Sequence, residues 1–201
     1  MGDAAGHYFD ADPTAPSAPR TVRLDLPDRS LVLRTDRGVF SGERVDPATK
    51  LLLLEAPDPP EEGVFVDVGC GYGPIACTLA ARRPRAVVWA VDVNRRALEL
   101  CRANAEDLGL DNVRTTGVDE LPAHLAVDLL WSNPPIRIGK AALHELLSAW
   151  LQRLTPAGRA VFVVHKHLGS DSLQRWFAEQ GWAATRLTSR DGNRLLEVHR
   201  R

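Results

Sequence analysis

The chain has 201 residues, of which 44% are hydrophobic and 25% are charged, and its formal net charge is −1 at pH 7. This length and composition are typical of a globular domain with a buried core and exclude a largely disordered chain. The longest apolar runs are too short to span a bilayer, and the nearly neutral charge does not by itself indicate nucleic-acid binding. No secretory signal is recognisable, so we expect a cytoplasmic protein without membrane attachment.

The N-terminal part of the chain predicts an arm, a hairpin and a helix. Residues 10–20 are rich in Pro and Ala and indicate an extended arm. The alternating runs 21–26 and 30–35 predict a β-hairpin. Asp46 followed by Pro47 is the start signal of a helix, with an N-cap and a proline in the first turn. We expect this region, residues 1–62, to form an extension that covers the active site of the main domain, residues 63–201.

From residue 63 onward, apolar strands alternate with helices. Strands are predicted at 63–68, 86–92, 112–117, 127–132, 159–165, 182–189 and 193–200, and helices at 74–83, 94–110, 139–154 and 170–181. The segment 155–158, "TPAG", is interpreted as the stop of the third helix. This alternation predicts a parallel sheet covered by helices on both faces. A helix followed by two adjacent strands adds one antiparallel strand at the end.

Three cysteines, Cys70, Cys77 and Cys101, are present. Their odd number and their spacing match no zinc pattern, so we expect reduced, mostly buried thiols and no metal site.

The stretch "VDVGCGYGP", residues 66–74, joins a strand to a helix through Gly69, Gly71 and Gly73. Glycines at the carboxyl end of a strand let a ligand approach the backbone, and the helix start adds free N–H groups. Counting from Gly71 to Ala76 gives the G-x-G-x-x-A variant of the dinucleotide fingerprint, so the glycines alone do not exclude a nicotinamide cofactor.

Two carboxylates restrict the class of ligand that this turn can bind. Asp67 precedes the glycine turn, where a negative charge favours a cationic ligand and opposes a pyrophosphate. Asp92 ends the next strand, at the position where an acid hydrogen-bonds ribose hydroxyls. S-adenosylmethionine, which combines an adenosine with a cationic sulfonium and amino group, fits both residues.

At this point the chain resembles the class I S-adenosylmethionine-dependent methyltransferases. "VDVGCGYGPIA" is similar to their motif I and "VDVN", residues 91–94, to their ribose-binding acidic loop. The resemblance implies an α/β fold with a Rossmann-like, seven-stranded, mostly parallel sheet, an antiparallel last strand and, here, a small N-terminal hairpin extension. It implies that the cofactor contacts Asp67, Gly69, Cys70, Gly71, Gly73, Asp92, Val93, Asp119 and Asn133. The acid that often contacts adenine would fall near Val118, one residue before Asp119.

The stretch "WSNPPIRIGK", residues 131–140, ends the fourth strand at the same edge of the predicted sheet. Two prolines stop the strand and push Asn133 toward extended geometry. An exocyclic amine is a poor nucleophile because its lone pair is delocalised. Acceptors at its N–H groups orient it, and the Asn133 amide oxygen and the Pro134 carbonyl are placed to be those acceptors.

The Asn-Pro-Pro motif is similar to that of methyltransferases acting on adenine N6, guanine N2 or a glutamine amide. "NPPIRIGK", with "HYF" at 7–9, "GVFS" at 38–41 and "VDPATKLLL" at 45–53, resembles the methyltransferase small domain family of the RsmC type. That resemblance implies transfer to the guanine N2 amine of 16S ribosomal RNA and a single-domain form of the enzyme. It implies catalytic roles for Asn133, Pro134, Pro135 and Ile136 and substrate contacts for Arg137, Lys140 and Phe40, with Thr49 as a further candidate.

Three other functions remain open at this stage. The same Asn133 geometry suits adenine N6 or a protein glutamine. A cofactor-binding module without catalysis would have no need of the Asn-Pro-Pro turn, and Asp67 opposes a nicotinamide oxidoreductase. The sequence names neither the target nucleotide nor the oligomeric state.

Overall fold

The computed structural model describes residues 14–201, with the side chains of Arg137 and Leu168 left aside. The predicted "HYF" segment lies outside the described residues. The helices are α1 (Pro47–Glu55), α2 (Pro74–Arg82), α3 (Arg95–Asp107), α4 (Lys140–Leu151) and α5 (Ser170–Glu179), with short 3₁₀ turns η1 (Val118–Glu120), η2 (Ile136–Ile138) and η3 (Lys166–Leu168). The strands are β1 (Arg20–Asp25), β2 (Ser30–Thr35), β3 (Glu62–Val68), β4 (Arg85–Val91), β5 (Val113–Thr116), β6 (Val127–Ser132), β7 (Leu154–His165), β8 (Trp182–Arg190) and β9 (Asn193–Arg200).

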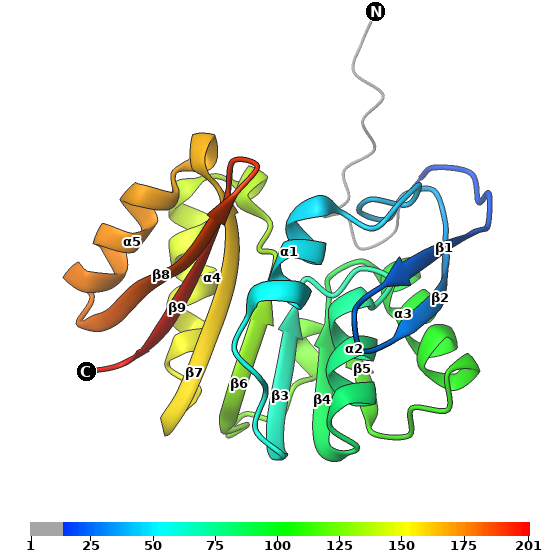
Figure 1. Cartoon of the computed structure of the whole chain (residues 1–201), viewed down its shortest axis with the longest axis horizontal. Helices are drawn as coiled ribbons and strands as arrows, with labels where there is room; N and C mark the ends of the chain where they lie inside the picture. The colour runs from blue at the N-terminus through cyan, green and yellow to red at the C-terminus, as the bar shows by residue number, and fades with distance from the viewer. Residues whose placement is uncertain (1–13) are drawn as a thin grey trace, which may run out of the picture.

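Seven strands form one sheet in the order β5-β4-β3-β6-β7-β9-β8 (Figure 1). The pairs from β5 to β7 are parallel, whereas β9 pairs antiparallel with both β7 and β8. β9 therefore enters the sheet between β7 and β8 against the direction of the others. This is the predicted Rossmann-like α/β sheet with an antiparallel last strand, and the switch in strand order from β3–β4 to β6 opens a ligand-binding crevice at the carboxyl edge.

A separate hydrophobic core covers each face of the sheet. On one face Phe65, Trp131 and Val163 pack with α1, α2, α3 and the β1–β2 hairpin. On the other face Val66 and Phe162 pack with α4 and α5. Neighbouring residues of β3 thus serve opposite cores, as the two-residue period of a strand requires. Burial on both faces explains why the strands are continuously apolar.

The predicted hairpin and first helix are confirmed. β1 and β2 pair in an antiparallel register, and Asp46 caps α1 by accepting a hydrogen bond from the Thr49 amide at 2.9 Å. Their apolar side chains, among them Leu24, Leu33 and Leu52, join the core shared with α2 and α3. The division of the chain at residue 62 stays a prediction, because this shared core runs through both parts.

The interpretation of "TPAG" as a helix stop outside any strand is wrong. Residues 155–158 belong to β7, whose pairing with β6 moves from Val127–Leu154 to Leu129–Arg159. The extra residues on β7 form a bulge, and Pro156 is tolerated there because a bulge frees its position from the regular ladder.

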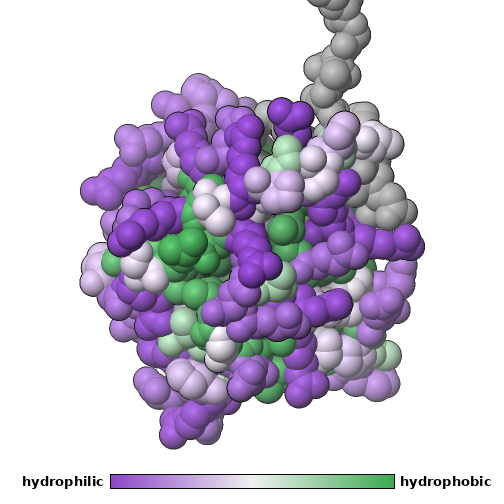
Figure 2. Space-filling view, turned by 90° about the vertical axis from the view of Figure 1, so that its right-hand side faces the viewer, coloured by the Kyte–Doolittle hydropathy of each residue, from purple (hydrophilic) through white to green (hydrophobic). Residues whose placement is uncertain are grey.

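Seen from the side of the hairpin and α3, the surface is mostly hydrophilic, with a smaller hydrophobic area between polar side chains (Figure 2). Among the described residues, no helix is both long and apolar enough to cross a membrane.

Candidate active site

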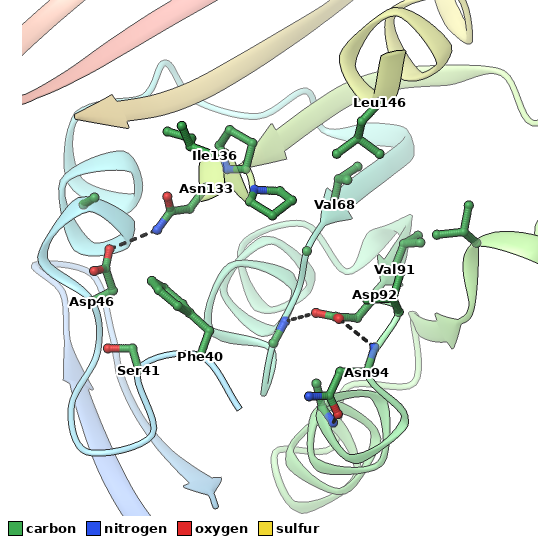
Figure 3. Close-up of a pocket in the computed structure, with 18 of the residues that line it drawn as sticks. Phe40, Ser41, Asp46, Val68, Val91, Asp92, Asn94, Asn133, Ile136 and Leu146 are labelled. Atoms are coloured by element: carbon green, nitrogen blue, oxygen red, sulfur yellow. Dashed lines mark hydrogen bonds between the residues drawn. The ribbon is translucent and has the colours of Figure 1, made fainter. Parts of the chain in front are cut away.

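A cavity of about 510 Å³ opens at the carboxyl edge of the sheet (Figure 3). This volume is in the range of small-molecule and cofactor sites. Its lining comes from the loop before α1, the glycine turn after β3, the ends of β4 and β6, and the β7–β9 end of the sheet. Those residues include Phe40, Ser41, Asp46, Gly69, Gly71, Asp92, Val93, Asn94, Val118, Asn133, Pro134, Pro135, Ile136, His165 and Asn193.

The glycine turn after β3 lies beside the cavity. Two of its positions need glycine, each for a different steric reason. Gly71 has φ +54°, and a Cβ added there would meet nothing within 4 Å, so the space above its backbone is open to a ligand. Gly73 has φ +93°, and a Cβ there would lie 2.6 Å from the Cys101 sulfur. Gly71 therefore allows a close ligand approach, whereas Gly73 allows the turn to pack on the core.

Asp92 joins the glycine turn to the start of α3. Its Oδ2 accepts a hydrogen bond from the Gly71 amide at 2.8 Å, and its Oδ1 accepts one from the Asn94 amide at 2.9 Å. Burial raises the pKa of Asp92 above its ordinary value, and hydrogen bonds from the backbone amides of Asn94, Gly71 and Val93 oppose that rise. Each carboxylate oxygen keeps a further lone pair, so the side chain can still accept from hydroxyl groups in the cavity.

Three apolar side chains are exposed inside this cavity. Phe40 is 47% exposed, Val93 46% and Val118 43%, although large hydrophobic residues are usually buried. Val93 follows Asp92 directly, and Val118 begins η1, just after the neighbouring strand β5. Exposed apolar groups gathered around a few polar ones are typical of a binding site for a planar organic ligand.

Asn133 has its amide orientation fixed from outside its own strand. Its Nδ2 donates to Asp46 Oδ2 at 3.0 Å (Figure 3). The same nitrogen donates to Thr49 Oγ1 at 3.1 Å. Both N–H bonds of the amide are therefore used by the start of α1. No described residue donates to the amide oxygen of Asn133, which lines the cavity, so this oxygen is available as an acceptor.

The two prolines after Asn133 make a tight turn. Pro135 has φ −74° and ψ 71°, and the Ile136 amide donates to the Pro134 carbonyl at 2.8 Å. This is an inverse γ-turn. The Pro134 carbonyl thus has one lone pair in the turn and one available to a ligand.

The loop before α1 is tied to both sides of the cavity. Asn94 caps α3 through the Ala97 amide and donates from its Nδ2 to the Gly38 carbonyl at 2.8 Å. Asp46 binds Asn133 at the other end of the same loop. The loop therefore bridges the β4 and β6 ends, and Ser41 within it has the unusual φ of +53°.

Several residues predicted for the site do not line the main cavity. Cys70 lines only a small recess beside it, Asp119 lies next to Val118 in η1, and Lys140 is exposed at the start of α4. Gly73 faces Cys101, and the side chain of Arg137 lies outside the described residues. Direct ligand contacts by these residues stay predictions.

Asp67 lies beneath the glycine turn, with no exposed surface. Its Oδ2 accepts from the Ala76 amide at 3.0 Å, and its Oδ1 has no hydrogen-bond partner among the described residues. Burial raises its pKa well above the ordinary value, and the charge of Asp92 adds to that rise. The structure gives Asp67 a place under the site, where it supports the turn, and a direct contact with a cationic ligand stays a prediction.

This raised pKa makes stability depend on pH. The unfolded chain loses the Asp67 proton near pH 4, whereas the folded chain keeps it, so folding is progressively destabilised as pH rises toward the folded pKa. Asp67→Asn removes this dependence. We expect the melting temperature of the variant minus that of the unchanged protein to increase from pH 5 to pH 8. A difference that does not change with pH would contradict a raised pKa of Asp67.

Sequence reasoning missed several cavity residues. Asp46 was recognised only as a helix cap, and Asn94, Ser41 and Asn193 were not singled out. The sequence signals were the place of Asn94 in "VDVN" and that of Asp46 in "VDPATKLLL", and neither stretch reveals the cavity contacts, which depend on tertiary packing.

The chain matches the family model of the methyltransferase small domain over residues 30–186. It is 34% identical to the uncharacterized protein YbxB of Bacillus subtilis, across 83% of this chain and 84% of that protein. It is 31% identical to ribosomal RNA large subunit methyltransferase G of Photobacterium profundum and 29% identical to ribosomal RNA small subunit methyltransferase C of Shewanella sediminis. These matches cover 79% and 80% of this chain but only 45% and 48% of those two relatives.

Among solved structures, the fold is similar to that of the T. thermophilus 16S rRNA N2 G1207 methyltransferase (RsmC), which was solved in complex with AdoMet and guanosine. The TM-score is 0.70 at 21% identity, and the match covers 92% of this chain and 52% of that one.

Proposed function

The chain belongs to the methyltransferase small domain family, and on that premise we propose that it uses S-adenosylmethionine to methylate the exocyclic N2 amine of a guanine in ribosomal RNA, with 16S RNA as the substrate. Acting on this RNA would place it in the cytoplasm. Relatives named as ribosomal RNA methyltransferases C and G support an RNA substrate. This chain spans about half the length of these two relatives. The proposed target therefore concerns only the part of them that this chain matches.

The hydrogen-bonded arrangement of Asn133 carries the proposal. Asp46 and Thr49 hold its Nδ2 at 3.0 and 3.1 Å, which leaves the amide oxygen of this cavity-lining residue as an acceptor. A module that only bound the cofactor would gain nothing from this fixed acceptor. A target amine needs it, because an acceptor on its N–H group directs its lone pair.

The cavity fits S-adenosylmethionine on its β3–β4 side. The open space above Gly71 takes a ligand against the backbone, and Asp92 supplies acceptors for the ribose hydroxyls. Val93 and Val118 supply apolar contacts for the adenine ring. When bound, the cofactor supplies an electrophilic methyl group on a sulfonium.

The target amine fits on the β6 side. Asn133 Oδ1 accepts one of its hydrogens, and the second lone pair of the Pro134 carbonyl accepts the other. Phe40 and Ile136 offer apolar surface for stacking of the base, as single-stranded or flipped bases require. The extra proton on the methylated nitrogen is acidic and leaves to water, so these residues need to supply no strong base.

Lys140 is exposed at the start of α4, four residues beyond the Asn-Pro-Pro-Ile motif, where an RNA phosphate can reach it. Lys140→Ala should raise the KM for RNA about threefold and leave the turnover number unchanged. The slope of the logarithm of the binding constant against the logarithm of the salt concentration should become shallower by about one, because one phosphate contact is lost. Arg85→Ala is the matched control, since Arg85 is an exposed cation at the amino end of β4. Equal effects of the two variants would remove Lys140 from the RNA-binding surface.

Methyl transfer from tritiated S-adenosylmethionine tests the substrate class. Naked ribosomal RNA, assembled ribosomal subunits and RNA-free protein extract are offered separately. We expect label in RNA or subunits and none in the protein extract. Label in protein alone would show that the Asn133 acceptor serves a glutamine amide.

A further inference from the structure

The carboxylate of Asp46 has a second oxygen that its structural role does not use. Both hydrogen bonds described above, from Asn133 Nδ2 and from the Thr49 amide, go to Asp46 Oδ2. No described residue donates to Asp46 Oδ1. Asp46 lines the cavity, and Oδ1 is not among the buried unpartnered atoms of the described residues, so it keeps exposed surface.

This free oxygen lies on the residue that holds Asn133. In Figure 3 the Asp46 carboxylate sits between Asn133 and Ser41 at the wall of the cavity. The Ser41 hydroxyl donates to the Arg44 carbonyl, so it does not donate to this carboxylate. Asp46 and Asn133 thus line the same cavity, and each carries an oxygen to which no described residue donates. The Asp46 oxygen belongs to a carboxylate, which when ionised can only accept.

Guanine matches this pair of acceptors and adenine does not. The edge of guanine carries an N1–H donor next to its N2 amine. Adenine carries its amine next to an N1 lone pair, which a carboxylate repels. A carboxylate facing N1–H also makes a charge-assisted hydrogen bond.

We propose that Asp46 is a specificity residue: its Oδ1 accepts the N1–H of the target guanine while Asn133 Oδ1 accepts an N2–H. The inference rests on the proposed function, because it takes the target to be a base bound beside Asn133. It adds the feature that selects guanine over bases whose N1 has no hydrogen.

The isosteric variant Asp46→Asn replaces a hydrogen-bond acceptor by a donor at one position, that of Oδ1. Its oxygen can still cap α1 and accept from Asn133, while its NH₂ group replaces Oδ1 at the cavity wall. That group donates, so it opposes guanine N1–H and suits an N1 lone pair. Thr49→Val is the matched control, because it removes another acceptor of the Asn133 amide and leaves Asp46 Oδ1 in place.

The experiment first locates the nucleotide that the unchanged protein labels in ribosomal RNA. Synthetic RNA fragments around that position then carry either guanine or 2-aminopurine, which keeps the N2 amine but has a lone pair at N1. We expect the unchanged protein to prefer guanine about 100-fold in kcat/KM. Asp46→Asn should reduce that preference to about threefold or less, whereas Thr49→Val should lower both rates in parallel and keep it.

The outcomes separate this inference from the proposed function. Labelled N2-methylguanosine with the same base preference in Asp46→Asn and the unchanged protein overturns the role of Asp46 alone. Equal methylation of guanine and 2-aminopurine by the unchanged protein overturns it even if the variant does not fold. Label on adenine N6 overturns both.

Discussion

Asn133→Ala should lower the turnover number for methyl transfer about 100- to 1,000-fold. Removing one preorganised hydrogen-bonding group at a reacting centre has an effect of that size. The affinity for S-adenosylmethionine should stay within about threefold, because Asp92 and the glycine turn lie on the other side of the cavity. Single-turnover transfer to RNA measures the first effect, and calorimetric titration with S-adenosylhomocysteine measures the second.

The control for Asn133→Ala is a measurement that shows the variant is still folded. The variant leaves Asp46 bound to the Thr49 amide, so the α1 cap is retained and the thermal unfolding midpoint should change little. Transfer at the unchanged rate would remove Asn133 from the chemistry. A parallel loss of cofactor binding would show that the variant disturbs the whole cavity.

Asp92→Asn should weaken cofactor binding about 100-fold, although the volume of the side chain hardly changes. The ribose hydroxyls lose a charge-assisted acceptor, a contact worth about 1.5–3 kcal/mol. An amide also cannot accept from both the Gly71 and the Asn94 amides, so the glycine turn loses one of its two ties. Turnover at saturating cofactor should remain near that of the unchanged protein, in contrast to Asn133→Ala.

The pH dependence of binding gives this prediction an internal check. Because burial raises the pKa of Asp92, the carboxylate becomes protonated at a higher pH than an ordinary aspartate as the solution is acidified. Affinity for S-adenosylhomocysteine should therefore fall with decreasing pH in the unchanged protein and stay flatter in Asp92→Asn. Asp111→Asn, at an exposed position before β5, is the control and should behave like the unchanged protein.

The fold was largely predictable because its signals are local. Continuous apolar strands, the Asp46-Pro47 helix start and the glycines after β3 each act within a few residues. The misread segment was 155–158, where threonine, proline and glycine indicate a turn. Its place in β7 depends on the β6 register, which shifts between Val127 and Leu129 and is not visible in the sequence.

The sequence predicted which residues lie at the strand ends around the site, but it did not predict the direction of their side chains. Asp92 and Asn133 reach the cavity as expected, since the carboxyl ends of parallel strands meet at one edge. Asp67 shares that edge, but its carboxyl group lies in the protein interior against the α2 amide of Ala76. The Asp46–Asn133 contact joins residues 87 positions apart, and only the packing of α1 over the sheet creates it.

The most direct test of the proposed chemistry is the identity of the methylated nucleoside. Ribosomal RNA labelled by the unchanged protein with tritiated S-adenosylmethionine is digested to nucleosides and separated by chromatography, with Asn133→Ala run in parallel. We predict label in N2-methylguanosine and its loss in the variant. Label in N6-methyladenosine, or label in N2-methylguanosine that persists in Asn133→Ala, would contradict a guanine amine held by the Asn133 oxygen.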